Sequence, residues 1–405
     1  MSRCLLRGAA PWLAAGVLAA PGLSGMALAA GADSEPSAKP RPREQAAESP
    51  ATGAPPGERR SREVPEGQET RTRREEPGPA SPRGTAEQDE EASFDDVEED
   101  TRATSSREPR AAKRCVPDAR FAGLWPRVDD VKFHPTTLEE RTAFSKLLPA
   151  MLRAAPVRRT PPATLEKVAA SVGFRLEVWE GRQDTFWVLR EKPGKLRGAG
   201  AYVVRTGPAT EDIVQVPHPW FDQGTEDIGV GLFACAPEGR RPRLFMTATA
   251  HRYHGNPGET PEDPEHPADV AHNPDHLFQE VTNQVARTLA APRVVQLHGF
   301  GTTKAAAGQR DTSLVAVVSS GTRQPMPWAR QVSRRLVKVL GEGVRLFPEG
   351  VQVLGGTRNA QGRLLQSYEC AHFLHLELSA QARKSLSSGE RQARMGRVLF
   401  APLED

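Results

Sequence analysis

Four ionisable residues lie where four apolar segments of the sequence end. His218 follows "DIVQVP", His251 follows "RLFMTATA", His298 follows "RVVQL", and Glu377 comes late in "HFLHLEL". Such segments are typical of buried strands, and the ligands of open α/β sheets bind beyond the carboxyl ends of the strands. We therefore expect these four side chains to meet at one edge of a sheet, where imidazoles and a carboxylate could bind a metal or transfer protons.

The segment around His218 contains a candidate metal-binding set. Asp222 lies four residues after His218, so one turn after Pro219 could return its carboxylate to the imidazole. His298 supplies a second imidazole from another strand. Catalytic zinc typically has three protein ligands and one open position, and it accepts nitrogen and oxygen together. We predict a zinc cofactor held by His218, Asp222 and His298; Glu226 is an alternative carboxylate ligand, unless it stabilises the start of the following helix.

Glu377 stands between two leucines of an otherwise apolar strand. A carboxylate in such a place must be paired, bound to a metal, or raised in pKa by burial. A raised pKa suits a general base that takes a proton from a metal-activated water. We predict that Glu377 is the catalytic base; a buried ion pair with an arginine is the alternative.

Cations near the strand ends are candidates for binding an acidic substrate. Arg252 directly follows His251, and Arg383 follows the strand that contains Glu377. An arginine fork matches the geometry of a carboxylate, although surface solvation can also explain single arginines. We predict that Arg383, His251 and Arg252 bind substrate, and that the Pro- and Gly-rich stretch 254–272 forms a loop over the site.

The order of the predicted elements indicates the fold that positions these residues. A helix at 137–154, a second helix ending at Gly173 and strand-like runs at 174–181, 185–192 and 200–206 come first. The later strands are expected at 212–218, 243–251, 293–301, 313–321, around 351–356 and at 372–379; the later helices are expected at 227–236, 274–291 (with Asn273 as its cap), 327–341 and 380–386. Apolar strands that alternate with amphipathic helices predict an α/β fold, a mostly parallel mixed sheet in a three-layer α/β/α arrangement.

The first 113 residues differ in composition from the rest. Residues 1–30 combine two early arginines, an apolar run and the small-x-small pattern of a cleavage site, which predicts a signal peptide and an exported, periplasmic or secreted protein. Residues 31–113 contain Phe94 as their only aromatic residue and are rich in Pro, Glu and Arg, which predicts a disordered linker. Residues 114–405 then form the catalytic domain, and no transmembrane span is expected after signal removal.

Charge and cysteine content narrow the possible partners. The net charge is +3 and the basic residues are spread along the chain, so a nucleic-acid partner is not expected. After signal removal, Cys115, Cys235 and Cys370 remain, which allows at most one internal disulfide. The alternative is that Cys235 and Cys370 are buried and unpaired. No feature of the sequence identifies a protein partner.

Three motifs together resemble the poly-γ-glutamate hydrolase family, a branch of the zinc carboxypeptidase-like fold. They are "PHPWFDQGTE", "VVQLHGF" and "HLELSAQAR" in the second half of the chain. The resemblance implies that His218, Asp222 and His298 hold zinc, that Glu377 is the base, and that Arg383 faces a substrate carboxylate. The chain departs from the family in having Asp222 in place of a glutamate and "PWF" in place of a glycine-rich run, which narrows the room for a polymer.

Together these observations predict an exported zinc-dependent amide hydrolase that uses a metal-activated water. Its substrate would be peptide-like or poly-glutamate-like, such as a γ-glutamyl or cell-wall peptide bond. The alternative is a catalytically inactive exported binding domain of the same fold, tethered by the disordered linker. A pocket in which His218, Asp222 and His298 lie within mutual ligand distance would favour the enzyme.

Overall fold

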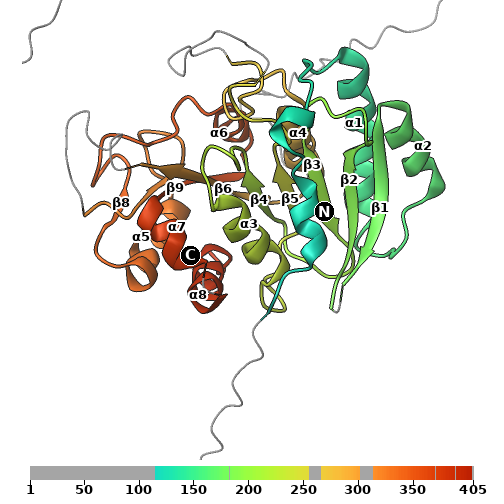
Figure 1. The fold of residues 1–405 in the computed structure, drawn as a ribbon. Helices are drawn as coiled ribbons and strands as arrows, with labels where there is room; N and C mark the ends of the chain where they lie inside the picture. Colours follow the sequence, from blue (N-terminus) through green and yellow to red (C-terminus); the bar gives the residue numbers. More distant parts are fainter. Residues whose placement is uncertain are drawn as a thin grey trace, which may run out of the picture. The chain divides into compact units, whose positions relative to one another are not determined.

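The computed structural model describes residues 115–181, 183–254, 266–301, 313–369, 371–387 and 389–403. The expected signal peptide and linker, and Cys370, lie outside this described part. A nine-stranded sheet runs through it, with the strand order β1-β2-β3-β5-β4-β6-β9-β7-β8 (Figure 1). The strands are β1 Phe174–Glu180, β2 Thr185–Glu191, β3 Ala201–Arg205, β4 Asp212–Val216, β5 Leu244–Thr247, β6 Arg293–Phe300, β7 Ala316–Ser319, β8 Val344–Leu346 and β9 His372–Ser379.

The centre of the sheet is parallel and is flanked by antiparallel pairs on both sides, with a parallel β7–β8 pair at one edge. Strands β5, β4, β6 and β9 run in the same direction. Strands β1, β2 and β3 pair antiparallel with their neighbours, and so do β7 and β9. The carboxyl ends of the four central strands therefore lie at one edge, which is where the sequence places the ionisable residues.

Helices cover both faces of the sheet, which confirms the predicted three-layer α/β/α arrangement. The helices are η1 Ala119–Leu124, η2 Val128–Asp130, α1 Leu138–Ala154, α2 Ala163–Ser171, α3 Thr225–Ala234, α4 Leu277–Thr288, α5 Pro327–Leu340, α6 Ala360–Gln366, α7 Ala380–Leu386 and α8 Gly389–Leu399. One apolar core joins α1, α2, α4 and α6 to the sheet, and a second joins α3, α5, α7 and α8 to the opposite face (Figure 1).

The face beneath α4 and α6 changes from apolar to polar toward the carboxyl ends of the strands. Phe373 on β9 still belongs to the apolar core. Because side chains alternate along a strand, His375 and Glu377 follow it on the same face of β9. On β6, Gln296 and His298 are the register partners of His375 and Glu377. Four polar side chains are thereby brought together at the end of an apolar layer.

The start of α4 differs from the prediction. The helix expected from Pro274 begins at Leu277, and its N-cap is His276 rather than Asn273. The Nδ1 atom of His276 accepts a backbone N–H of the first turn, while the side chain of Asn273 accepts the N–H of Asp275 in the preceding turn. A buried histidine therefore replaces the expected asparagine as the cap.

Two further predictions at the C-terminal end were wrong. The segment 351–356 is not a strand: Leu354 and Gly356 both have a φ of 61°, which interrupts an extended backbone. The strand that pairs with β7 at the edge of the sheet is instead β8, which precedes this segment in the sequence. The helix α7 is also not terminal, because α8 follows it and packs against α3 and α5.

A disulfide joins Cys115 to Cys235 at the end of α3, with a Cα–Cα distance of 5.7 Å. The alternative in which Cys235 stays unpaired was therefore wrong. No helix in the described part is long and apolar enough to cross a bilayer.

Candidate metal centre

The loop after β4 brings two of the predicted ligands together. The carbonyl oxygen of His218 accepts the N–H of Asp222 at 2.7 Å, which closes one helical turn between them. In such a turn, side chains four residues apart lie on one face. His218 Nδ1 and Asp222 Oδ2 consequently lie 3.4 Å apart, and both residues are buried.

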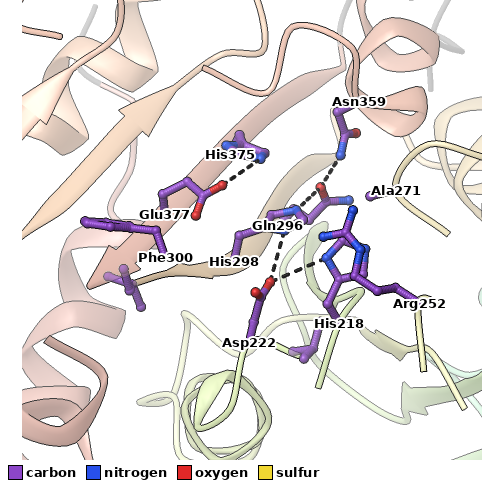
Figure 2. Close-up of polar contacts among 12 residues, drawn as sticks. His218, Asp222, Arg252, Ala271, Gln296, His298, Phe300, Asn359, His375 and Glu377 are labelled. Atoms are coloured by element: carbon purple, nitrogen blue, oxygen red, sulfur yellow. Dashed lines mark hydrogen bonds and ion pairs between the residues drawn. The ribbon is translucent and has the colours of Figure 1, made fainter. Parts of the chain in front are cut away.

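His298 approaches the same carboxylate from β6, the neighbour of β4. Its Nδ1 lies 3.3 Å from Asp222 Oδ2, so this oxygen stands between two imidazole nitrogens (Figure 2). The three residues each offer a ligand atom within 4.8 Å of the others. The structure thus brings together the predicted set of His218, Asp222 and His298.

A residue that the sequence analysis missed orients His218. Asp269 Oδ1 accepts a hydrogen bond from His218 Nε2 at 2.8 Å and another from the N–H of Ala271 at 3.1 Å. Its second oxygen contacts Arg252 and, at 3.0 Å, His272 Nδ1. A carboxylate behind a ligating histidine fixes the ring and its tautomer, which leaves Nδ1 of His218 as the free ligand atom.

An amide network fixes the tautomer of His298 in the same way. The Oδ1 atom of Asn359 accepts the N–H of Gly362, so its Nδ2 must donate, and it donates to Gln296 Oε1 at 2.5 Å. That oxygen therefore also accepts from His298 Nε2, at 2.8 Å. Because Nε2 carries the proton, the Nδ1 lone pair of His298 is available on the side of Asp222.

The donor atoms fit a divalent zinc ion. Among the described residues, His218 Nδ1 and Asp222 Oδ2 are fully buried and have no hydrogen-bond partner. Buried polar atoms are normally satisfied, because an unmade hydrogen bond costs about 1–3 kcal/mol. Two imidazole nitrogens and one carboxylate oxygen form a set of ligands that zinc commonly takes, with one coordination position left for water.

The charge states of His298 and Asp222 agree with this set of ligands, whereas a metal would displace a proton from His218, because a histidine must be neutral to bind a metal. Burial lowers the pKa of His298 to about 4, so its ring is neutral near pH 7. Burial is the largest influence on His218 and acts to lower its pKa, but the charge of Asp269 and the contacts with Asp222 and Asp269 together outweigh it and raise this pKa. For Asp222, burial acts to raise the pKa, yet the two imidazoles lower it well below its usual range, so the carboxylate stays ionised.

Glu377 lies beside this set on β9 and is not paired with an arginine. Its register partner on β6 is His298. No arginine in the described part forms an ion pair with it, and its Oε2 atom is buried without a hydrogen bond. Burial, and next the charge of Asp222, raise the pKa of its carboxyl to about 8. The arrangement therefore provides a buried carboxyl group that can exchange a proton near neutral pH, next to the candidate ligand set.

His375 is a second residue that the sequence analysis missed. Its ring stacks on His298 with a centroid distance of 4.5 Å, and its Nε2 lies 3.8 Å from Glu377 Oε1. The backbone of Gly356 lies so close that a Cβ atom there would be 2.6 Å from the ring. Its position two residues before Glu377 was the available signal, since residues i and i+2 of a strand share a face.

The remaining predicted residues lie around the centre and not among the three candidate ligands. Glu226 accepts the N–H of Gly224 at the start of α3, in the helix-stabilising role foreseen as its alternative. Arg383 donates to the backbone carbonyls of Gln223 and Leu378, at 2.7 and 2.5 Å. Arg252 contacts Asp269, and His251 packs on the rings of Phe221 and Tyr253.

No protein-family model and no curated protein match the chain. Several solved structures are similar at low TM-scores. N-formylglutamate amidohydrolase from Ralstonia eutropha is 14% identical, with a TM-score of 0.31, over 48% of this chain and 95% of that one. A "putative metallopeptidase" from Shewanella amazonensis is 9% identical, with a TM-score of 0.29, over 60% and 93%. A "putative carboxypeptidase" from Burkholderia mallei is 12% identical, with a TM-score of 0.29, over 66% and 67%.

Proposed function

We propose that the chain is an exported zinc-dependent amide hydrolase acting on a peptide-like or poly-glutamate-like substrate. The observation that carries this proposal is the convergence of three buried ligand atoms, on His218, Asp222 and His298, beside Glu377, whose Oε2 atom is buried without a hydrogen-bond partner. A binding domain without catalytic activity has no need of a buried carboxyl with a raised pKa next to such a set.

When bound by His218, Asp222 and His298, zinc would supply a water of lowered pKa and would polarise the scissile carbonyl. Glu377 would take the proton of the attacking water and hold it on its carboxyl group. Burial favours the protonated carboxyl, so Glu377 keeps this proton out of solvent until the leaving amine can receive it. Asp269 and Gln296 would hold the two imidazole rings throughout.

Export is supported by the cysteines as well as by the N-terminal residues. The disulfide between Cys115 and Cys235 joins residues 120 positions apart. Structural disulfides persist in oxidising compartments such as the bacterial periplasm and the extracellular space, and they are rare in the cytosol. Together with the signal-like residues 1–30, this pair favours a site of action outside the cytoplasm.

The proposed activity is tested by amine release from a panel of N-acyl amino acids, γ-glutamyl peptides and cell-wall stem peptides. The zinc-loaded protein is compared with Glu377→Gln and with the control His134→Ala. His134 is an exposed histidine in the segment before α1 and is not one of the candidate ligands. We expect Glu377→Gln to retain zinc but to lose about 100- to 10,000-fold in kcat, the usual contribution of a general base. Equal turnover by Glu377→Gln would contradict the proposal.

A further inference from the structure

An aromatic cluster lies beside the metal centre. It consists of the rings of Phe221, His251 and Tyr253 and the guanidinium group of Arg252. The ring centroid of Phe221 lies 5.4 Å from that of Tyr253 and 6.2 Å from that of His251, and the latter two are 5.6 Å apart. The guanidinium carbon of Arg252 lies 5.0 Å from the ring of Phe221 and 5.2 Å from that of Tyr253.

Phe221 belongs to the same turn as two of the proposed zinc ligands. Its N–H donates to the carbonyl oxygen of His218 at 3.1 Å, and the next N–H, that of Asp222, donates to the same oxygen. In a helical turn, the residue three positions on flanks the face that carries residues i and i+4. The ring of Phe221 is therefore held next to the face that carries His218 and Asp222.

Arg252 fixes the cluster to the centre from the other side. Its guanidinium forms an ion pair with Asp269, the residue that orients His218, while it also stacks on the rings of Phe221 and Tyr253. A guanidinium over an aromatic face is stabilising, more so when it is desolvated. Arg252 thus connects the aromatic cluster to Asp269 and, through it, to His218.

The order of the strands places the cluster opposite the proposed base. Along the sheet, the sequence of neighbours is β5, β4, β6, β9. Arg252 and Tyr253 follow β5, the two ligand-bearing segments follow β4 and lie on β6, and Glu377 lies on β9. This order leaves room for a substrate with its carbonyl at the centre to extend from Glu377 on one side toward the cluster on the other.

The cluster also presents apolar surface to solvent. Phe221 is 37% exposed, one of few large apolar side chains in the described part with so much accessible surface. Tyr253 and His251 are half-buried. Aromatic surface of this kind gains free energy when another ring or a large apolar group covers it, through burial and through edge-to-face contact.

We propose that Phe221, Tyr253 and His251 form a substrate subsite for an aromatic or large apolar group, attached to the scissile carbonyl on the side away from Glu377. This proposal rests on the proposed metal-dependent function. It means that the preferred substrate is not a purely acidic polymer. The substrate carries an aromatic or large apolar group next to the carbonyl of its scissile amide bond.

The test uses two probes with the same metal-binding head, acetohydroxamate and phenylacetohydroxamate, titrated into the zinc-supplemented full chain by calorimetry. We expect the wild type to bind the phenyl probe at least about tenfold more tightly, the ratio that corresponds to 1.4 kcal/mol. In Phe221→Ala this ratio should fall to about twofold or less. Phe221→Leu should keep an intermediate ratio, and Leu138→Ala, which removes an exposed apolar side chain on α1, should keep the full ratio.

The outcomes separate this inference from the function on which it rests. If acetohydroxamate binds but the wild type shows no preference for the phenyl probe, or if Phe221→Ala retains it, the subsite is contradicted and the metal centre stands. If neither probe binds to the zinc-supplemented wild type, both the centre and the subsite are contradicted. Zinc content measured on each variant distinguishes a lost subsite from a lost metal.

Discussion

His298 and Glu377 are register partners on the neighbouring parallel strands β6 and β9. The backbone hydrogen bonds that build the sheet therefore also set the separation between a proposed zinc ligand and the proposed base. Neither side chain depends on a mobile loop for its position, whereas Asp222 reaches the centre through a single turn after β4. Because both lie on strands, His298 and Glu377 are expected to be the most rigid parts of the centre.

The hydrogen-bond acceptor behind His298 should control metal affinity. Gln296→Leu removes the oxygen that holds Nε2 of His298, so the ring loses its fixed tautomer and orientation. We expect zinc affinity to fall by about 10- to 100-fold, as is usual for such outer-shell partners. Competition with a fluorescent zinc chelator measures the change. Gln215→Met is the control, since Gln215 joins the same network without touching the ring; an equal loss in both variants would contradict a specific role of Gln296.

Metal binding should release a proton from Glu377. Burial and the charge of Asp222 raise the pKa of this carboxyl to about 8 in the metal-free protein, so it is mostly protonated at pH 7. A nearby divalent cation favours the ionised form, and the proton leaves when zinc binds. Calorimetric titration with zinc at pH 7 in two buffers of different ionisation enthalpy counts the protons. We predict nearly one proton fewer for Glu377→Gln than for the wild type, and an unchanged count would sink this assignment.

Stability should decrease in mild acid because of His276, the N-cap of α4. Burial lowers the pKa of this ring from 6.5 to about 4. Between these values the unfolded chain binds more protons, so the stabilisation present above pH 6.5 is lost as the pH falls toward 4, by about 3 kcal/mol at most. Urea unfolding at pH 7 and pH 4.5 measures this loss. His276→Asn keeps a capping side chain that does not titrate, and it should flatten the difference; a slope as steep as in the wild type would show that other groups cause it.

Much of the candidate site could be predicted from the sequence because each chemical group follows an apolar run. His218, His298 and Glu377 come at or near the ends of parallel strands, and parallel strands place their ends at one edge. The spacing of four residues between His218 and Asp222 was informative for a similar reason, since it suits one helical turn. Local periodicity was enough to place these four residues.

The residues that orient the two candidate histidine ligands could not be predicted in this way, because they lie in segments without hydrophobic periodicity. Asp269 lies in the long connection between β5 and α4, and Asn359 caps the short α6, which the sequence analysis did not identify. Their contacts with His218 and Gln296 join parts of the chain 51 and 63 residues apart. The strand expected at 351–356 was wrong for a similar reason. Leu354 and Gly356 have a φ of 61°, and such a backbone conformation cannot be inferred from the apolar pattern alone.

The disulfide should make a large contribution to stability. It closes a loop between residues 120 positions apart, and restricting the unfolded chain over such a length contributes about 2–5 kcal/mol. We expect Cys115→Ser and Cys235→Ser to lower the urea midpoint at pH 7 by similar amounts. In reductant, the urea midpoint of the wild type should fall to that of the variants. The midpoints of the variants should not change with reductant, because they lack this disulfide. A midpoint unaffected by either substitution would contradict a structural role for the pair.

The most direct test of the metal centre is elemental analysis of the purified chain after incubation with zinc and removal of the excess. We predict about one zinc per chain in the wild type, since three ligand residues and one open position complete a catalytic site. His298→Ala and Asp222→Ala should each retain less than about one tenth of this zinc, while His134→Ala retains all of it. Absence of zinc from the wild type, or zinc that persists in both ligand variants, would contradict a metal centre at His218, Asp222 and His298.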